Sequence, residues 1–154
     1  LLNLLAGEDN DYEGQLWFQG ICIKDKKALY HYQAHEVAYY VQFPLFFDNL
    51  LALPNIALSF QDRPVPRALI KRFRLPLEQT VGTYSGGQRK QLSLLHFPTT
   101  RKSVLLYDEP TRGLDEIQQQ KVMNYLKAQR HAIVIFTTHH EALAKQHADR
   151  IVYL

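Results

Sequence analysis

The sequence holds a single cysteine, Cys22, so no disulfide can form within the chain, and a reducing compartment is expected. It also lacks a long apolar run: the longest, such as residues 132–136, have the length of a strand and are too short to cross a membrane. Net charge is small as well, because 18 Lys and Arg stand against 15 Asp and Glu, and no nucleic acid partner is expected. Any work at a membrane is therefore predicted to depend on a partner.

What is present fits one domain with a sizeable core, since 154 residues include 46% apolar ones. Residues 1–7 are typical of the end of an apolar helix, with Gly7 just past its last turn. Residues 150–154 stop within an apolar run that we interpret as a strand. We therefore expect both ends to be cuts through a larger domain, of which residues 1–154 form one incomplete unit.

The first half of the chain predicts strands followed by helices. Two runs, 15–18 and 21–23, stand beside the turn residues Gly14 and Gly20 and are expected to be antiparallel strands. Residues 37–41 form a continuous apolar run, which predicts a strand buried on both faces. Residues 1–42 are thus expected to be core plus antiparallel strands.

A mostly helical subdomain is predicted over residues 43–84. Four apolar residues at helical spacing precede Pro54, namely Phe46, Phe47, Leu50 and Leu51. Pro64 and Pro66 then open a basic stretch, residues 67–74. Its basic face is expected to be solvated; a docking surface for a partner is the weaker alternative.

Residues 85–154 alternate between helices and strands and are predicted to complete the core. Helices are expected at 86–97, 116–128 and 141–146, and strands at 103–107, 132–136 and 151–154. The second helix should bury four side chains: Ile117, Val122, Tyr125 and Leu126. Such alternation is typical of an α/β fold with a parallel sheet and right-handed crossovers.

Polar residues follow two of these predicted strands directly. Asp108 and Glu109 come after residues 103–107, and residues 137–140, which include His139, come after residues 132–136. Ligands of open parallel sheets bind beyond the carboxyl ends of strands. An aspartate there can hold Mg²⁺ and the next glutamate can activate water, whereas the simpler alternative is a helix N-cap and turn.

A serine and two glycines lie 23 residues before Asp108, and they are expected to open a helix. In this turn, Ser85–Gly87, backbone N–H groups could approach an anion closely. Alone, the turn would be read as flexible, but the acidic pair follows it one helix and one strand later.

Together these segments resemble the ATP-binding cassette (ABC) family. Residues 84–88 resemble its signature motif, residues 104–109 its Walker B strand and residues 111–115 its D-loop. Gln42 is similar to the Q-loop glutamine and His139 to the switch histidine. The resemblance covers the whole chain, with residues 1–7 similar to the helix that follows the family's Walker A loop. It implies a P-loop NTPase-type three-layer core with a mainly parallel sheet, a small antiparallel part and a helical subdomain.

The resemblance also implies roles for individual residues, with ATP and Mg²⁺ as cofactors. Asp108 would hold Mg²⁺, Glu109 would polarise the attacking water, and His139 would contact the γ-phosphate. Gln42 would sense the metal, the water and the γ-phosphate. The remaining residues would act across a head-to-tail dimer of two ABC ATPase domains, reaching the partner's site or its ATP: Ser85, Gly86, Gly87, Gln88 and Asp115.

The sequence departs from the family in several places. The Walker A loop is absent and no Gly-Lys dipeptide occurs, so the chain alone is expected to bind ATP weakly or not at all. The family's adenine-stacking aromatic residue is missing too. Tyr84 replaces the usual leucine, and residues 91–96 lack the common Ala-Arg-Ala pattern.

The resemblance predicts the ATP-hydrolysing domain of a membrane transporter, placed at the cytoplasmic face of a membrane by a transmembrane partner. Residues 111–115 and the short helical subdomain resemble exporter-type cassettes more than importer-type ones. One alternative is a soluble ABC ATPase acting on DNA or ribosomes. Another is a non-catalytic, truncated cassette, although Glu109 and His139 are both present.

Overall fold

A computed structural model describes residues 1–41, 46–60, 73–95 and 102–153. A three-stranded parallel sheet lies at its centre in the order β3-β4-β5, formed by Val37–Tyr40, Val104–Tyr107 and Ile133–Phe136. The register pairs Tyr40 with Tyr107 and Tyr107 with Phe136, so the three strands end level with one another. All their carboxyl ends therefore meet at one edge of the sheet.

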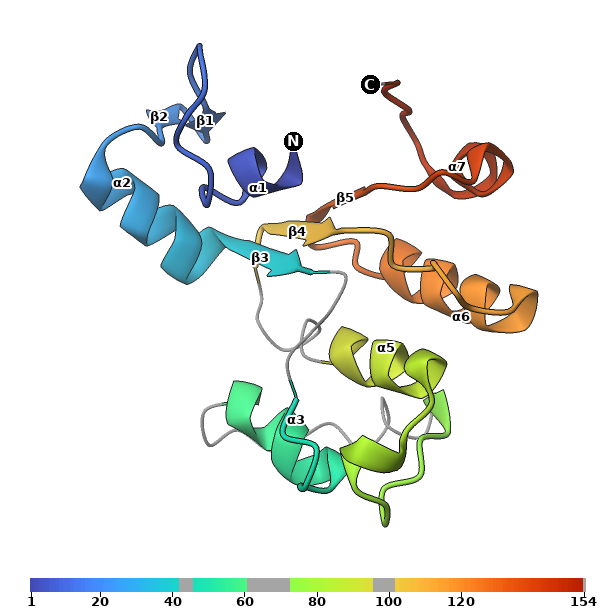
Figure 1. The fold of residues 1–154 in the computed structure, drawn as a ribbon. Helices are drawn as coiled ribbons and strands as arrows, with labels where there is room; N and C mark the ends of the chain where they lie inside the picture. The colour runs from blue at the N-terminus through green and yellow to red at the C-terminus, as the bar shows by residue number, and fades with distance from the viewer. Residues whose placement is uncertain (42–45, 61–72, 96–101, 154) are drawn as a thin grey trace.

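Helical layers cover both faces of the sheet (Figure 1). Helix α1 (Leu2–Leu5) lies on one side, and helices α5 (Gly86–Leu94) and α6 (Glu116–Lys127) lie on the other. Strand β4 shows why both layers are needed, because its residues alternate between faces. Val104 and Leu106 pack with Leu2, whereas Leu105 and Tyr107 pack with the α5 and α6 side chains. The predicted three-layer α/β fold is confirmed.

The small antiparallel part is also confirmed. Strands β1 (Trp17–Phe18) and β2 (Ile21–Cys22) pair across Gln19 and Gly20, whose φ angles of 49° and 79° suit a two-residue hairpin turn. Trp17 is 58% exposed on this hairpin. Helix α2 (Lys26–His31) and the π-helical turn Tyr32–Glu36 follow. This helical segment was not predicted, although Asp25 carries the N-cap signal and accepts hydrogen bonds from two backbone N–H groups.

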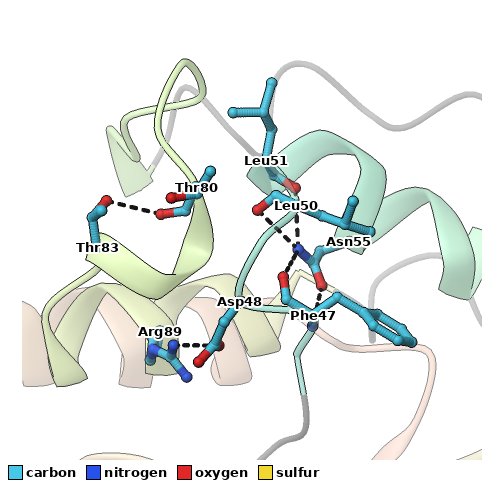
Figure 2. A network of polar contacts seen from close by, with 8 residues as sticks. All are labelled: Phe47, Asp48, Leu50, Leu51, Asn55, Thr80, Thr83 and Arg89. Carbon is cyan, nitrogen blue, oxygen red and sulfur yellow. Dashed lines mark hydrogen bonds and ion pairs between the residues drawn. The ribbon is translucent and has the colours of Figure 1, made fainter.

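Residues 46–51 form a turn, although the spacing of their apolar residues predicts a helix. The Asn55 side chain is 3% exposed and binds backbone groups of Phe47, Leu50 and Leu51 (Figure 2). These bonds satisfy the turn's backbone, so helix α3 (Ala52–Phe60) begins after it and carries Pro54 in its first turn. Prolines 64 and 66 and the basic residues 67–72 lie outside the described residues.

Three further expectations about the second half were wrong or shifted. Ile117 is 71% exposed because it lies on the outer face of α6, whereas Val122, Tyr125 and Leu126 are buried as predicted. Helix α5 ends at Leu94, short of the predicted residue 97. Residues 151–153 follow α7 (Glu141–His147) without forming the predicted strand, since no described strand supplies hydrogen-bond partners for them.

Candidate active site

The carboxyl ends of the three strands form the framework of the candidate site. Beyond the strand pairs, the N–H of Asp108 donates to the carbonyl of Tyr40 (3.0 Å). The N–H of Thr137 likewise donates to the carbonyl of Tyr107 (3.0 Å). The hydrogen bonding between neighbouring strands thus continues for one residue beyond β4 and β5, and it fixes the backbone of Asp108 and Thr137 at the edge of the sheet.

Thr137 joins the two acidic residues at this edge. Its hydroxyl donates to Oδ1 of Asp108 (2.8 Å) and accepts from the backbone N–H of Glu109 (3.1 Å). Thr137, the residue after β5, therefore orients both the Asp108 carboxylate and the Glu109 backbone. No role for Thr137 is predicted from the sequence, although a hydroxyl residue directly after a strand, at the same sheet edge as the acidic pair, is a signal for one.

Glu109 has an uncommon backbone conformation for a residue other than glycine, with φ of 45°. Such conformations cost free energy and persist where surrounding contacts hold them. Its carboxylate lies 2.7 Å from Nε2 of His139 and 3.7 Å from Nη1 of Arg112. The Glu109 side chain is 14% exposed, so its charge is largely shielded from bulk water while the His139 ring and the Arg112 guanidinium approach it.

A cleft of about 330 Å³ opens beside this carboxylate. It is lined by residues that follow β4 and β5 and by one residue of helix α6: Glu109, Thr111, Arg112, Gly113, Gln119, Thr138, His139 and His140. Water and a polar ligand can therefore reach Glu109 and His139 from the same side. A carboxylate that has a histidine at hydrogen-bond distance and borders an open cleft has the geometry of a general base.

Asp108 fits the chemistry of Mg²⁺. Its carboxylate is half-buried and offers oxygen, the donor that Mg²⁺ prefers, while the Thr137 hydroxyl fixes its orientation. Within the described residues, no group of three or more His, Cys, Asp or Glu side chains could hold a metal by itself. Mg²⁺ at nucleotide sites commonly uses one or two carboxylates and completes its shell with water and phosphate, so a lone Asp108 suits that mode.

The turn at Ser85 begins helix α5 and lies at the surface. Ser85 Oγ accepts from the N–H of Gln88 (3.2 Å), and Gln88 Oε1 accepts from the N–H of Ser85 (2.8 Å). This reciprocal capping box gives Gln88 a structural task at the helix start. Ser85 and Gly86 are exposed, so the turn is not part of the core.

The two glycines of this turn have different surroundings. A Cβ placed on Gly87 would lie 3.0 Å from Oε1 of Gln118 and 3.3 Å from Cδ2 of Leu114, whereas one on Gly86 would meet nothing within 4 Å. Gly87 therefore allows α5 to approach the start of α6 closely. Gly86 leaves open space in front of the turn.

Of the predicted site residues, the structure brings Asp108, Glu109 and His139 together. Asp115 is exposed and caps α6, where its carboxylate accepts from the N–H of Gln118 (2.8 Å). Neither Ser85 nor Asp115 lines the cleft next to Glu109. Gln42 lies outside the described residues.

Comparisons with known proteins agree on one family. The model of the family described as ABC transporter matches residues 1–112. A sulfate/thiosulfate import ATP-binding protein of Gloeobacter violaceus is 29% identical over 100% of this chain and 47% of its own length. A methionine import ATP-binding protein of Rhodopseudomonas palustris is 27% identical over 100% of this chain and 45% of its own. The chain thus spans about half the length of these curated relatives.

Solved structures share the fold. A dimeric ATP-binding cassette in a post-hydrolysis state, bound to ADP and Pi, is 20% identical with a TM-score of 0.74, covering 94% of this chain and 70% of that one. The ATP-binding subunit of an ABC transporter is 19% identical with a TM-score of 0.77, covering 96% and 65%. Among the described residues, no helix is both long and apolar enough to span a membrane.

Proposed function

The chain belongs to the ABC transporter family, and on that premise we propose that it contributes the water-activating half of an ATP-hydrolysing site that powers transport across a membrane. The observation that carries the proposal is the Glu109 carboxylate, which lies 2.7 Å from Nε2 of His139 in a residue that lines the cleft. Helix capping, the simpler interpretation of an acidic pair after a strand, does not account for this, because Glu109 points to His139 and Arg112.

Each residue then has a defined task. Asp108 would hold Mg²⁺, which when bound neutralises charge on the phosphates. Glu109 accepts a proton from the attacking water, and Thr137 keeps both acidic residues in place. His139 is 91% exposed in its side chain, so it can hold the Glu109 carboxylate and also contact a phosphate entering the cleft. Gln42 is proposed to contact metal and water, as the family resemblance implies.

A second ABC ATPase domain and a transmembrane partner complete the proposal. Ser85, Gly86, Gly87 and Asp115 would face the second domain in a head-to-tail dimer, which the surface position of the Ser85 turn permits. The domain would then sit at the cytoplasmic face of the membrane. The relatives described above are named import proteins, so they do not support the exporter-type expectation, and we propose an importer.

Steady-state phosphate release by the full-length protein tests this function, using the wild type, Glu109→Gln and a matched control. Glu109→Gln keeps the size of the side chain but removes its proton-accepting charge, so the rate should fall by about 10² to 10⁴. Glu116→Gln is the control, because Glu116 lies exposed in the first turn of α6. An inactive wild type, or Glu109→Gln with the parental rate, would contradict the proposal.

A further inference from the structure

Lys90 of helix α5 is a buried lysine that no step of the proposed reaction uses. It is 9% exposed, although lysines are rarely buried unless a partner compensates the charge. Its ammonium group donates to the backbone carbonyl of Arg112 (2.8 Å), a residue 22 positions further along the chain. The contact therefore joins the helix that begins at Ser85 to the loop that carries Glu109.

The charges around Lys90 belong to the candidate active site. Burial lowers the pKa of Lys90, the charges of Glu109 and Asp108 raise it, and Arg112 lowers it. A buried cation is costly unless hydrogen bonds and opposite charge offset the loss of water. The Arg112 carbonyl and the acidic pair offset part of that cost, although burial outweighs them and the pKa of Lys90 is lowered overall. The hydrogen bond therefore ties the position of the loop to that of the lysine.

The loop that Lys90 holds has little regular structure of its own. Two of its residues have positive φ angles, Glu109 (45°) and Gly113 (75°). Its backbone bonds include two short-range ones, from Arg112 N–H to the Glu109 carbonyl (3.2 Å) and from Leu114 N–H to the Thr111 carbonyl (3.2 Å). Thr137 fixes the start of the loop, whereas Lys90 reaches its middle.

We propose that Lys90 is a positioning residue: it binds the Arg112 carbonyl and so keeps the Glu109 carboxylate aligned with the cleft. This inference rests on the proposed function, in which Glu109 activates water. Arg112 is also the residue whose guanidinium approaches Glu109 (3.7 Å), so displacement of its backbone would move that cation as well. Loss of the Lys90 contact should therefore impair the chemical step more than the binding of ATP.

The neighbouring residue Arg89 offers a matched control on the same helix. It forms an ion pair with Asp48, on the turn before α3 (Figure 2). The Asp48 carbonyl also accepts from the N–H of Gly82 (2.8 Å), so Asp48 keeps a backbone anchor without Arg89. The Arg89 and Asp48 side chains are 32% and 63% exposed, and exposed ion pairs contribute little to stability.

The test measures kcat and KM for Mg-ATP in the full-length wild type, Lys90→Met, Lys90→Arg and Arg89→Met. Lys90→Met should lower kcat at least tenfold and leave KM within twofold. Lys90→Arg keeps a cationic donor and should recover most of kcat, and Arg89→Met should match the wild type. If Lys90→Met does not fold, as judged by circular dichroism, Lys90→Gln replaces it under the same criteria.

The outcomes separate the inference from the function on which it rests. A wild type without ATP hydrolysis overturns the proposed function itself. An active wild type with unchanged kcat in Lys90→Met overturns the role of Lys90 and leaves the function standing. A raised KM with normal kcat, or an equal loss in Arg89→Met, would also overturn it, because either would point to nucleotide binding or to a general effect on helix α5.

Discussion

The substitution Thr137→Val removes the hydroxyl that links Asp108 to Glu109 and keeps a branched side chain of similar shape. It deletes one hydrogen bond to a carboxylate (2.8 Å) and one from a backbone N–H (3.1 Å). A hydrogen bond to a charged group contributes about 1.5–3 kcal/mol and a neutral one about 0.5–1.5 kcal/mol. The sum, about 2–4.5 kcal/mol, is the expected loss in free energy of unfolding, and it should lower Tm by roughly 4–18 °C.

Thr138→Val is the matched control for this change. Thr138 is the next residue, and its hydroxyl accepts one exposed hydrogen bond, from the N–H of His140 (3.1 Å). That loss should cost roughly 0.5 kcal/mol or less, as is usual at exposed positions. Urea unfolding followed by circular dichroism measures both variants, and Thr137→Ser should remain near the wild type because it keeps the hydroxyl. Equal stability of the two valine variants would refute the linking role of Thr137.

Three further predictions concern the core, the turn at Ser85 and alkaline pH. Leu126→Ala should cost about 2–5 kcal/mol in urea unfolding because Leu126 is 3% exposed, whereas Ile117→Ala should cost less than about 0.5 kcal/mol. Gly87→Ala should be less stable than Gly86→Ala by about 1 kcal/mol, since of these two glycines Gly86 has free space for a methyl group and Gly87 does not; equal midpoints would contradict this. Burial raises the pKa of Tyr40 to about 12 from 10.0, so its contribution to stability is complete below pH 10 and is lost as pH rises towards 12. A pH series should show a steeper loss over this window in the wild type than in Tyr40→Phe.

The parallel sheet and the acidic edge could be predicted because their signals are local and strong. Residues 104–107 form a continuous apolar run, and both faces of β4 are indeed buried. Because the carboxyl ends of parallel strands lie at one edge of a sheet, the polar residues that follow two such runs are expected to lie close together. The structure agrees, since Asp108 contacts Thr137 and Glu109 contacts His139. The alternation of strands and helices along the chain then predicts a parallel sheet with helices packed on its faces.

The parts that could not be predicted depend on contacts between distant segments. The turn at residues 46–51 is set by the buried Asn55 side chain, which overrides the helical spacing of its apolar residues. Ile117 suits the inner face of a helix by residue type, yet the position of α6 against the sheet leaves it in solvent. Thr137 and Lys90 act through partners 29 and 22 residues away, which the sequence pattern does not reveal.

In the proposed function, Glu109 is needed to cleave ATP but not to bind it between two copies of the domain. Light scattering of full-length Glu109→Gln in Mg-ATP tests both parts at once. A stable dimer should persist in this variant, while the wild type returns to monomers as ATP is consumed. A variant that stays monomeric, or that returns to monomers as fast as the wild type, would contradict the claim.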